Sequence, residues 1–309
     1  MLGTRVKEVI MAEPFVGTET DRTKSKWVAK AYQDFVEEFG RSRTTLRTLF
    51  YYALQRKASD YPICGGFVGE IRITRPYHES DGERLPKWVN KARRLGFIPE
   101  DAILEEIPEE CIFIPKIQKD RPYSIEVWLN KSALNPLLYP ICEKYSVNLV
   151  SVNSRPSNQV IEDLFKRCKY STIILCLSDL SSSGFSFCRD LAQKIVDSEP
   201  SRGDLDIRLK RISLLPEQIL ELKIPMVHGI MGSNEDKDSF KKYLKSYALD
   251  PKRMAELDAL EVYYPGGVGR FLDETLSKYS NKFDSDFESW LLDLKKGVFP
   301  NAMDFDIIK

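Results

Sequence analysis

Short apolar segments alternate with amphipathic stretches through the middle of the chain, and this pattern restricts the possible folds more than any other feature. The segments are SIEVWL, VNLVSV, STIILCLS and DIRLKRISL, and stretches with helical spacing such as NQVIEDLFKRC separate them. STIILCLS is apolar almost throughout, which is typical of a strand covered on both faces of a parallel sheet. Strands that alternate with helices at this spacing predict an α/β domain with a parallel sheet.

The first part of the chain has a different order of elements. A helix is expected over residues 25–39, where Gly40 would end it. A second helix is expected to start at Thr44 or Thr45, which are suitable N-caps. GGFVGEIRI predicts a glycine-broken hairpin, and RLPKWVNKARRLG predicts a third helix, which Gly96 ends.

Helix, helix, short strands and a further helix in this order are typical of a winged-helix domain. We therefore expect a flexible arm over residues 1–24, a winged-helix domain over 25–119 and the α/β domain over 120–309, with a helical C-terminal extension. An α/β chain with these two domains is the predicted fold class.

Composition excludes several classes of protein. Lys and Arg number 46, as do Asp and Glu, so the net charge is zero and a nucleic-acid site would have to be a local basic patch. No apolar run approaches the roughly 18 residues that a bilayer crossing needs, and the N-terminus lacks a secretory signal. The six cysteines show no CxxC spacing, which indicates reduced thiols in a cytoplasmic or nucleoid-associated protein.

Four cations fall on one face of the third predicted helix. They are Arg84, Lys87, Lys91 and Arg94, and the apolar residues of that helix lie on the opposite face. A basic face on a well-anchored helix suits DNA, because each Lys or Arg replaces a condensed counterion on the phosphate backbone. The alternative is an ordinary solvated helix face.

Several stretches carry a family resemblance and follow one another in order. TTLRTLFYYALQR has an arginine four residues before a tyrosine, and ARRLGFIPEDAI has the pattern AR, Gly, Ile-Pro. IEVWLNKSALNPLLYPICEKYSVNLVSVNSRPS precedes IILCLSDLSSSG, KRISLLPEQILELKIP and AELDAL. Together they resemble the topoisomerase VI A-subunit family, which includes the meiotic double-strand-break transesterase and winged-helix–Toprim proteins of phages and prokaryotes.

The resemblance implies a CAP-like winged helix followed by a Toprim domain, double-stranded DNA as the partner, and a homodimer. A Toprim site binds Mg²⁺ through a glutamate after the first strand and an Asp-x-Asp pair after the third, and the metal stabilises the oxygens of phosphoryl transfer. The sequence has no ATPase-like GHKL or P-loop signature. Energy-coupled topoisomerase activity would therefore need a separate ATPase-type subunit.

The expected metal ligands are depleted in this chain. Asn130, beside Lys131, stands where the family has the glutamate. Asp179 keeps the first acid of the pair, and Ser181 replaces the second. Two lost carboxylates should weaken Mg²⁺ binding, because that ion dehydrates reluctantly. Glu256 and Asp258 of AELDAL are the best candidates to replace them, and the alternative is that these two acids cap or bridge a helix.

On the same alignment, Tyr51 matches the nucleophile and Arg47 the motif arginine. A tyrosine has a pKa near 10, so attack on a phosphate would need help from a cation such as Arg47, one turn earlier on the helix. The alternative is that LFYYAL is the buried aromatic side of the winged-helix core.

Three functions stay open at this point. The first is a DNA-binding protein with a degenerate Toprim site and reduced or lost strand cleavage. The second is an active Mg²⁺-dependent DNA-nicking or cleaving enzyme, either a Tyr51 transesterase or a Toprim nuclease. The third is a non-catalytic assembly subunit that uses the amphipathic tail with Trp290, Leu291 and Leu294.

Overall fold

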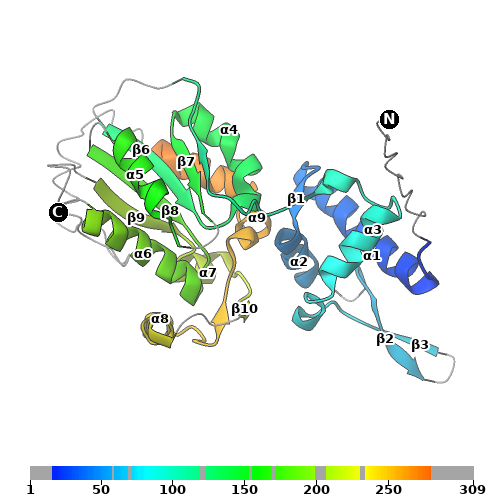
Figure 1. Cartoon of the computed structure of the whole chain (residues 1–309). Coiled ribbons are helices and arrows are strands. Elements are labelled where there is room, and N and C mark those ends of the chain that lie inside the picture. The colour runs from blue at the N-terminus through cyan, green and yellow to red at the C-terminus, as the bar shows by residue number, and fades with distance from the viewer. Residues whose placement is uncertain are drawn as a thin grey trace, which may run out of the picture. The chain divides into compact units, whose positions relative to one another are not determined.

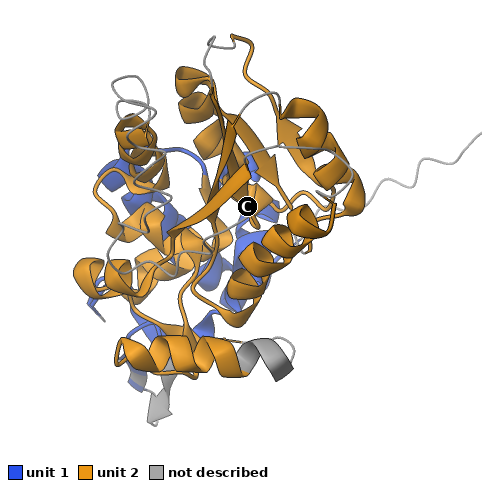
Figure 2. Cartoon of the chain, turned by 90° about the vertical axis from the view of Figure 1, so that its left-hand side faces the viewer, with its two compact units in different colours: residues 1–43, 56–102 blue, residues 44–55, 103–309 orange. Residues whose placement is uncertain are grey.

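The computed structural model describes residues 16–57, 59–68, 71–117, 123–152, 155–168, 171–198, 207–229 and 234–279 (Figure 1). The chain divides into two compact units, which have different colours in Figure 2. Unit 1 comprises residues 1–43 and 56–102, and unit 2 comprises residues 44–55 and 103–309. The expected amphipathic tail lies outside the described residues, as does most of the arm expected over residues 1–24.

The described part of unit 1 has two α-helices, a hairpin and two short 3-10 helices. They are α1 (Glu19–Phe39), α3 (Leu85–Arg94), the antiparallel strands β2 (Ile63–Val68) and β3 (Ile71–Arg75), η1 (Glu79–Asp81) and η2 (Glu100–Ala102). Gly40 and Gly96 follow the two helices with φ of 66° and 70°, which confirms both predicted stops.

Helix α1 begins earlier than residue 25, the expected start. Thr18 and Asp21 form a capping box, in which the Thr18 hydroxyl accepts from the Asp21 N–H at 3.2 Å and the Asp21 carboxylate accepts from the Thr18 N–H at 3.1 Å. These bonds satisfy N–H groups that a helix start otherwise leaves without partners. The polar start of the helix therefore belongs to α1 and not to a loose arm.

An aromatic cluster holds α1 against α3. Trp27 stacks on Tyr77 with ring centroids 5.1 Å apart and meets Trp88 of α3 edge-on at 5.6 Å. Leu85, Trp88 and Ala92 are buried, as the spacing of the apolar residues predicted. Nearby, Arg75 holds the buried Asp81 carboxylate by two hydrogen bonds of 2.6 and 2.7 Å.

Unit 2 is built on a five-stranded sheet, in the order β5-β7-β6-β8-β9. The strands are β5 (Cys111–Phe113), β6 (Tyr123–Leu129), β7 (Asn148–Ser151), β8 (Ser171–Leu177) and β9 (Ile207–Ser213). All neighbours pair in parallel except the edge strand β5, which is antiparallel to β7. The predicted α/β class with a mostly parallel sheet is confirmed.

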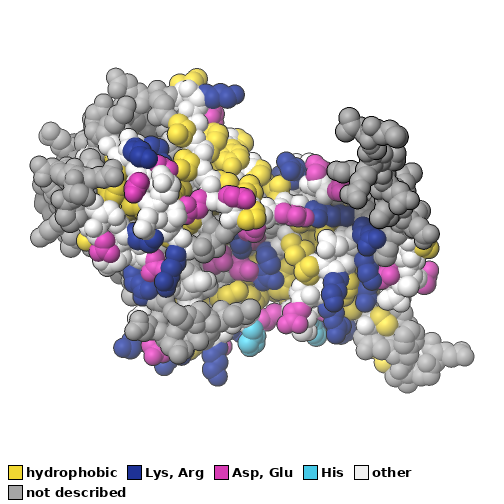
Figure 3. Space-filling model, in the orientation of Figure 1, with side chains coloured by type: hydrophobic (Ala, Val, Ile, Leu, Met, Phe, Trp, Pro, Cys, Tyr) yellow, Lys and Arg dark blue, Asp and Glu magenta, His cyan; other side chains and the backbone are white. Residues whose placement is uncertain are grey.

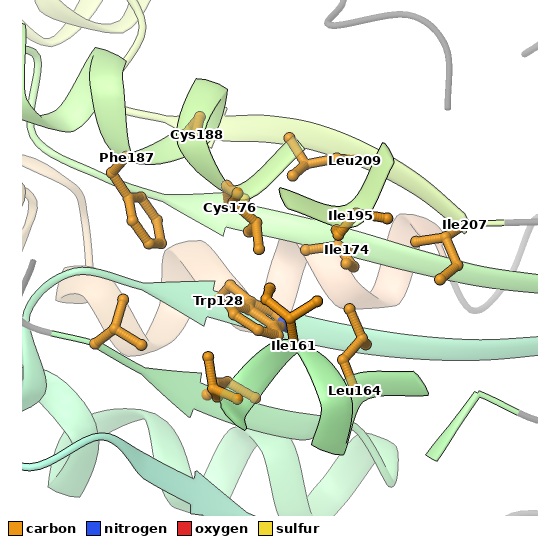
Figure 4. Packing of buried hydrophobic residues seen from close by; sticks show 14 of the residues in the cluster. Trp128, Ile161, Leu164, Ile174, Cys176, Phe187, Cys188, Ile195, Ile207 and Leu209 are labelled. Atoms are coloured by element: carbon orange, nitrogen blue, oxygen red, sulfur yellow. The ribbon is translucent and has the colours of Figure 1, made fainter. Parts of the chain in front are cut away.

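Helices cover the sheet of unit 2. They are α4 (Asn135–Tyr145), which follows the 3-10 helix η3 (Ser132–Leu134), α5 (Asn158–Arg167), α6 (Ser182–Ser198) and a helix over residues 267–279. Figure 4 shows Trp128, Ile174 and Cys176 of the strands packed against Ile161 of α5 and Phe187 of α6. Helix α4 contains two prolines. Pro136 lies in the first turn, where its missing N–H has no helical partner, and the helix continues through Pro140.

The C-terminal part of unit 2 contains further helices and a short pair of strands. They are α7 (Pro216–Leu222), α8 (Asn234–Ser246), the antiparallel strands β10 (Val227–His228) and β11 (Arg253–Met254), η5 (Leu257–Ala259) and α9 (Leu260–Tyr263). The described part of the tail is mostly helical, in agreement with the predicted C-terminal extension.

One helix of the expected winged-helix segment belongs to unit 2. Strand β1 (Thr44–Thr45) pairs in parallel with β4 (Ile103–Leu104), and α2 (Leu46–Leu54) packs on η5 and α9. The compact units therefore divide the chain differently from the boundary expected near residue 119. The reason is long-range packing of α2, which the local pattern of LRTLFYYAL does not reveal.

Candidate functional site

The carboxyl ends of β6 and β8 form the natural place for a site in this sheet. From β6 the chain passes through α4 to β7 on one side, and from β8 it passes through α6 to β9 on the other. In open α/β sheets, ligands bind beyond the strand ends at the point where the connections diverge in this way. Asn130 and Lys131 follow β6 directly, and Asp179 lies two residues after the end of β8.

A distant segment, residues 253–259, is fixed to this edge. Leu180 and Ala255 form an isolated antiparallel bridge with hydrogen bonds of 2.8 and 3.1 Å. The N–H of Leu257 also donates to Asp179 Oδ1 at 2.7 Å. The bridge and this hydrogen bond together hold residues 255–257 beside Asp179, and Glu256 and Asp258 thereby join the same cluster.

Helix α2 supplies three further side chains. Thr45 is its N-cap, whose hydroxyl accepts from the Thr48 N–H at 3.0 Å and also hydrogen-bonds Asp258. Arg47 forms an ion pair with Glu256, and Tyr51 Oη accepts a hydrogen bond from the Glu256 N–H at 3.1 Å. Positions about 200 residues apart in sequence therefore meet in one cluster within unit 2.

Lys131 lies between the three acids. Its ammonium is paired with Asp258 and lies 3.7 Å from Asp179 Oδ1 and 3.8 Å from Glu256 Oε1. Only 12% of the side chain is exposed. Burial by itself would lower the pKa of Lys131, but the charges of Asp179, Asp258 and Glu256 outweigh it and raise that pKa above its usual value. The lysine is therefore a permanent cation within the cluster.

Tyr51 is wholly buried in unit 2, with 0% of its surface exposed. Burial, followed by the charge of Glu256, raises the pKa of Tyr51 well above its usual value, and Arg47 does not offset this. Burial also raises the pKa of Glu256, against the lowering effect of Lys131 and Arg47. In this structure Tyr51 is a neutral phenol that solvent does not reach. To attack a phosphate, it would have to become exposed and to lose its proton.

Ser181 has a structural partner. Its hydroxyl accepts a hydrogen bond from the Gly184 N–H at 3.0 Å, as the residue before the first turn of α6 commonly does. Helix α6 thus starts at Ser182, directly after this cap. Gly184 allows this turn to approach the strand end, because a Cβ there would lie 2.2 Å from the Asp179 carbonyl oxygen.

The residues at this cluster do not fit the Mg²⁺ ion that the family resemblance implies. Each of the three carboxylates already faces a cation or a donor of the chain, and the Lys131 ammonium lies between them. Asn130 brings no charge, and its Oδ1 is buried with no hydrogen-bond partner within the described residues. Among these residues no group of three or more His, Cys, Asp or Glu side chains is arranged to hold a metal ion.

Five candidates from the sequence thus meet in space, namely Arg47, Tyr51, Asp179, Glu256 and Asp258. Sequence reasoning missed Thr45 and Lys131 as members of the cluster. Lys131 had a usable signal, since it directly follows a predicted strand beside Asn130. Thr45 was predicted as an N-cap, which it is, but its bond to Asp258 could not be foreseen.

The predicted basic face lies on α3 in unit 1, and in Figure 3 Lys and Arg side chains gather on the face of unit 1 that carries this helix. Arg84, Lys87 and Arg94 are exposed. Lys91 is less available than predicted, because its ammonium pairs with Asp21 of α1.

No protein-family model matches the chain, and a search of curated proteins found no match either. None of the helices in the described ranges combines the length and the apolar composition that crossing a membrane requires.

Proposed function

We propose that this chain is a double-stranded-DNA-binding protein of the topoisomerase VI A-subunit type, with a winged helix, a Toprim domain and reduced or lost strand cleavage. The observation that carries the proposal is the two-sided character of α3. Its apolar side is buried by α1, while Arg84, Lys87 and Arg94 face solvent. A rigid helix with an exposed cationic face suits contact with phosphates and with groove edges.

Local charge is needed for this role because the whole chain carries no net charge. Each cation that contacts a phosphate releases a counterion and makes the logarithm of affinity fall by about 0.9 per decade of salt. Three exposed cations on one helix therefore predict a measurable salt dependence.

The test is duplex binding as a function of salt for wild type, Arg84→Ala and Lys87→Ala. Each variant should weaken binding to unrelated sequences alike and reduce the salt slope by about 1. Lys166→Ala is the matched control, since Lys166 is an exposed lysine on α5 of unit 2. If the salt dependence of duplex binding is unchanged in both α3 variants, α3 is not the DNA contact.

The loss of cleavage is supported by the candidate site. Asn130 and Ser181 replace two carboxylates, Ser181 caps α6, and Tyr51 is buried. Supercoiled plasmid should therefore stay intact when the wild type is incubated with Mg²⁺ or Mn²⁺. Nicking by the wild type that Asp179→Ala abolishes would overturn this part of the proposal.

An active metal-dependent nicking enzyme is the second candidate, and the convergence of Arg47, Tyr51, Asp179, Glu256 and Asp258 favours it. If nicking occurs, Tyr51→Phe separates the two chemistries, because a transesterase loses activity and a hydrolase keeps it. A homodimer, a separate ATPase-type subunit and a nucleoid location are proposals that follow from the resemblance. The assembly-subunit alternative depends on the tail, and deleting the residues after 280 would test it through the oligomeric state.

A further inference from the structure

We infer that the Lys131 ammonium takes the place of a divalent cation in this chain, so that Asp179, Glu256 and Asp258 form a latent cation site that opens when the ammonium is removed. The inference deepens the proposed loss of cleavage and rests on it, but it is independent of DNA binding. The ligand class is a hard divalent cation such as Mg²⁺ or Mn²⁺, which prefers oxygen ligands.

The geometry of the ammonium carries the inference. Lys131 Nζ contacts one oxygen of Asp258 and lies 3.7 and 3.8 Å from oxygens of Asp179 and Glu256. A lysine ammonium has three donors, and here three acids converge on it. The acids come from the end of β8 and from residues 256–258, and Lys131 comes from the end of β6. The Lys131 ammonium therefore contacts acids from segments that are remote in sequence, as a bound metal ion also does in many proteins.

The ammonium and a divalent ion exclude each other at this position. Mg²⁺ needs oxygens at about 2.0–2.1 Å, so an ion among the same carboxylates would lie in the immediate neighbourhood of Nζ. Two cations so close together in a poorly solvated cluster would repel strongly. Lys131 must leave before a metal can enter.

The charge balance indicates what happens when it leaves. Three carboxylates face Lys131 and Arg47, which leaves one net negative charge when all are ionised. Among the described residues, loss of the ammonium would leave these acids with one ion pair, between Arg47 and Glu256, since the buried Arg211 donates to the backbone carbonyl of Asp179 and not to its carboxylate. The side chains of Asp179, Glu256 and Asp258 are 17%, 12% and 1% exposed. Buried carboxylates without partners are costly, and a dication would relieve that cost.

Thermal unfolding of Lys131→Met, followed by circular dichroism in EDTA and in millimolar Mn²⁺, tests the inference. Methionine keeps an unbranched side chain and removes the charge. In EDTA the variant should unfold several degrees below the wild type, by about 2–4 °C for each kcal/mol lost. Mn²⁺ should restore at least half of the difference, while the wild type should unfold at the same temperature in both buffers.

Two controls separate charge from packing. Lys144→Met removes an exposed lysine that pairs with Asp273 in the same unit, and it should give no response to Mn²⁺. The double variant Lys131→Met, Asp258→Asn removes one ligand together with the ammonium. It should be more stable in EDTA than Lys131→Met, because its cluster has the wild-type net charge of one negative unit again, and it should lose the response to Mn²⁺.

Absence of a Mn²⁺ response in folded Lys131→Met would overturn the inference. If Lys131→Met does not fold, Mn²⁺ binding to the wild type is measured instead, by titration followed with electron paramagnetic resonance. If the wild type binds Mn²⁺ and Asp179→Asn abolishes that binding, the inference is also overturned. If the wild type shows no such Mn²⁺ binding, the inference is supported. Failure of the α3 variants to change DNA binding would refute only the proposed function, so the two failures are distinguishable.

Discussion

Glu126 is a buried charge whose removal should strongly destabilise unit 2. It lies on β6 and is 1% exposed. Arg167 of α5 donates to its two carboxylate oxygens at 2.7 and 3.0 Å, Trp128 Nε1 donates at 2.8 Å, and Asn148 donates at 3.0 Å. Glu126 therefore serves as the centre of a structural network, and it is not available to replace the missing glutamate of the candidate site.

Glu126→Ala would leave the Arg167 guanidinium, which is 15% exposed, without its carboxylate. Breaking a buried pair by removing one partner costs about 3–5 kcal/mol. For a unit of about 200 residues, each kcal/mol lowers the melting temperature by about 2–4 °C, so we expect a fall of roughly 6–20 °C.

Urea unfolding followed by circular dichroism measures this loss directly, since the midpoint falls in proportion to the free energy of unfolding. Lys166→Ala is the control, because its partner Asp163 lies on the same helix and the lysine is 61% exposed, and its midpoint should not move. The double variant Glu126→Leu, Arg167→Leu should recover much of the stability. A loss below about 1 kcal/mol in Glu126→Ala would refute the reasoning, because it would mean that Arg167 reaches solvent at little cost.

Three further predictions concern other parts of the chain. Burial by itself would raise the pKa of Asp81, but hydrogen bonds from Arg75 and the charge of that arginine lower it overall. The stabilisation by Asp81 is therefore fully present above the pKa of an unfolded aspartate, and it is lost as the pH falls through the lower pKa of the folded state. In Asp81→Asn, the free energy of unfolding of unit 1 should therefore depend less on pH in this acid range, which acid titration of the unfolding would measure. Gly184→Ala should destabilise unit 2 by about 1–3 kcal/mol in urea unfolding, since the new Cβ meets the backbone carbonyl of residue 179 at 2.2 Å, and a neutral result would contradict the assigned role of the glycine. Asp21→Asn should free Lys91 and steepen the salt dependence of DNA binding by about 1, and an unchanged slope would place Lys91 outside the DNA contact.

Local sequence patterns predicted the elements that depend on local physics. The apolar run STIILCLS became the buried strand β8, and Thr45 became the N-cap of α2. Gly40 and Gly96 follow their helices in the left-handed conformation, as predicted. Each of these outcomes depends on periodicity, on a cap or on backbone freedom within a few residues.

Partners that lie far away in the sequence could not be predicted in the same way. Lys91 was expected to face DNA, but its partner Asp21 is 70 residues away on another helix. The Leu180–Ala255 bridge that brings Glu256 to the cluster is a single pair of residues with no sequence signal. Glu256 and Asp258 were found through the family resemblance alone, and their ion pairs with Arg47 and Lys131 became visible only in three dimensions.

Residues 44–55 have a practical consequence for anyone who divides this protein for experiments. Thr45, Arg47 and Tyr51 complete the cluster of unit 2, although the chain enters unit 1 both before and after them. A C-terminal fragment cut near residue 120 would lose α2, and with it three polar partners of Glu256 and Asp258. A fragment intended to retain the native cluster must therefore start before Thr44, and mutations in α2 and in AELDAL should be designed together as parts of one packing unit.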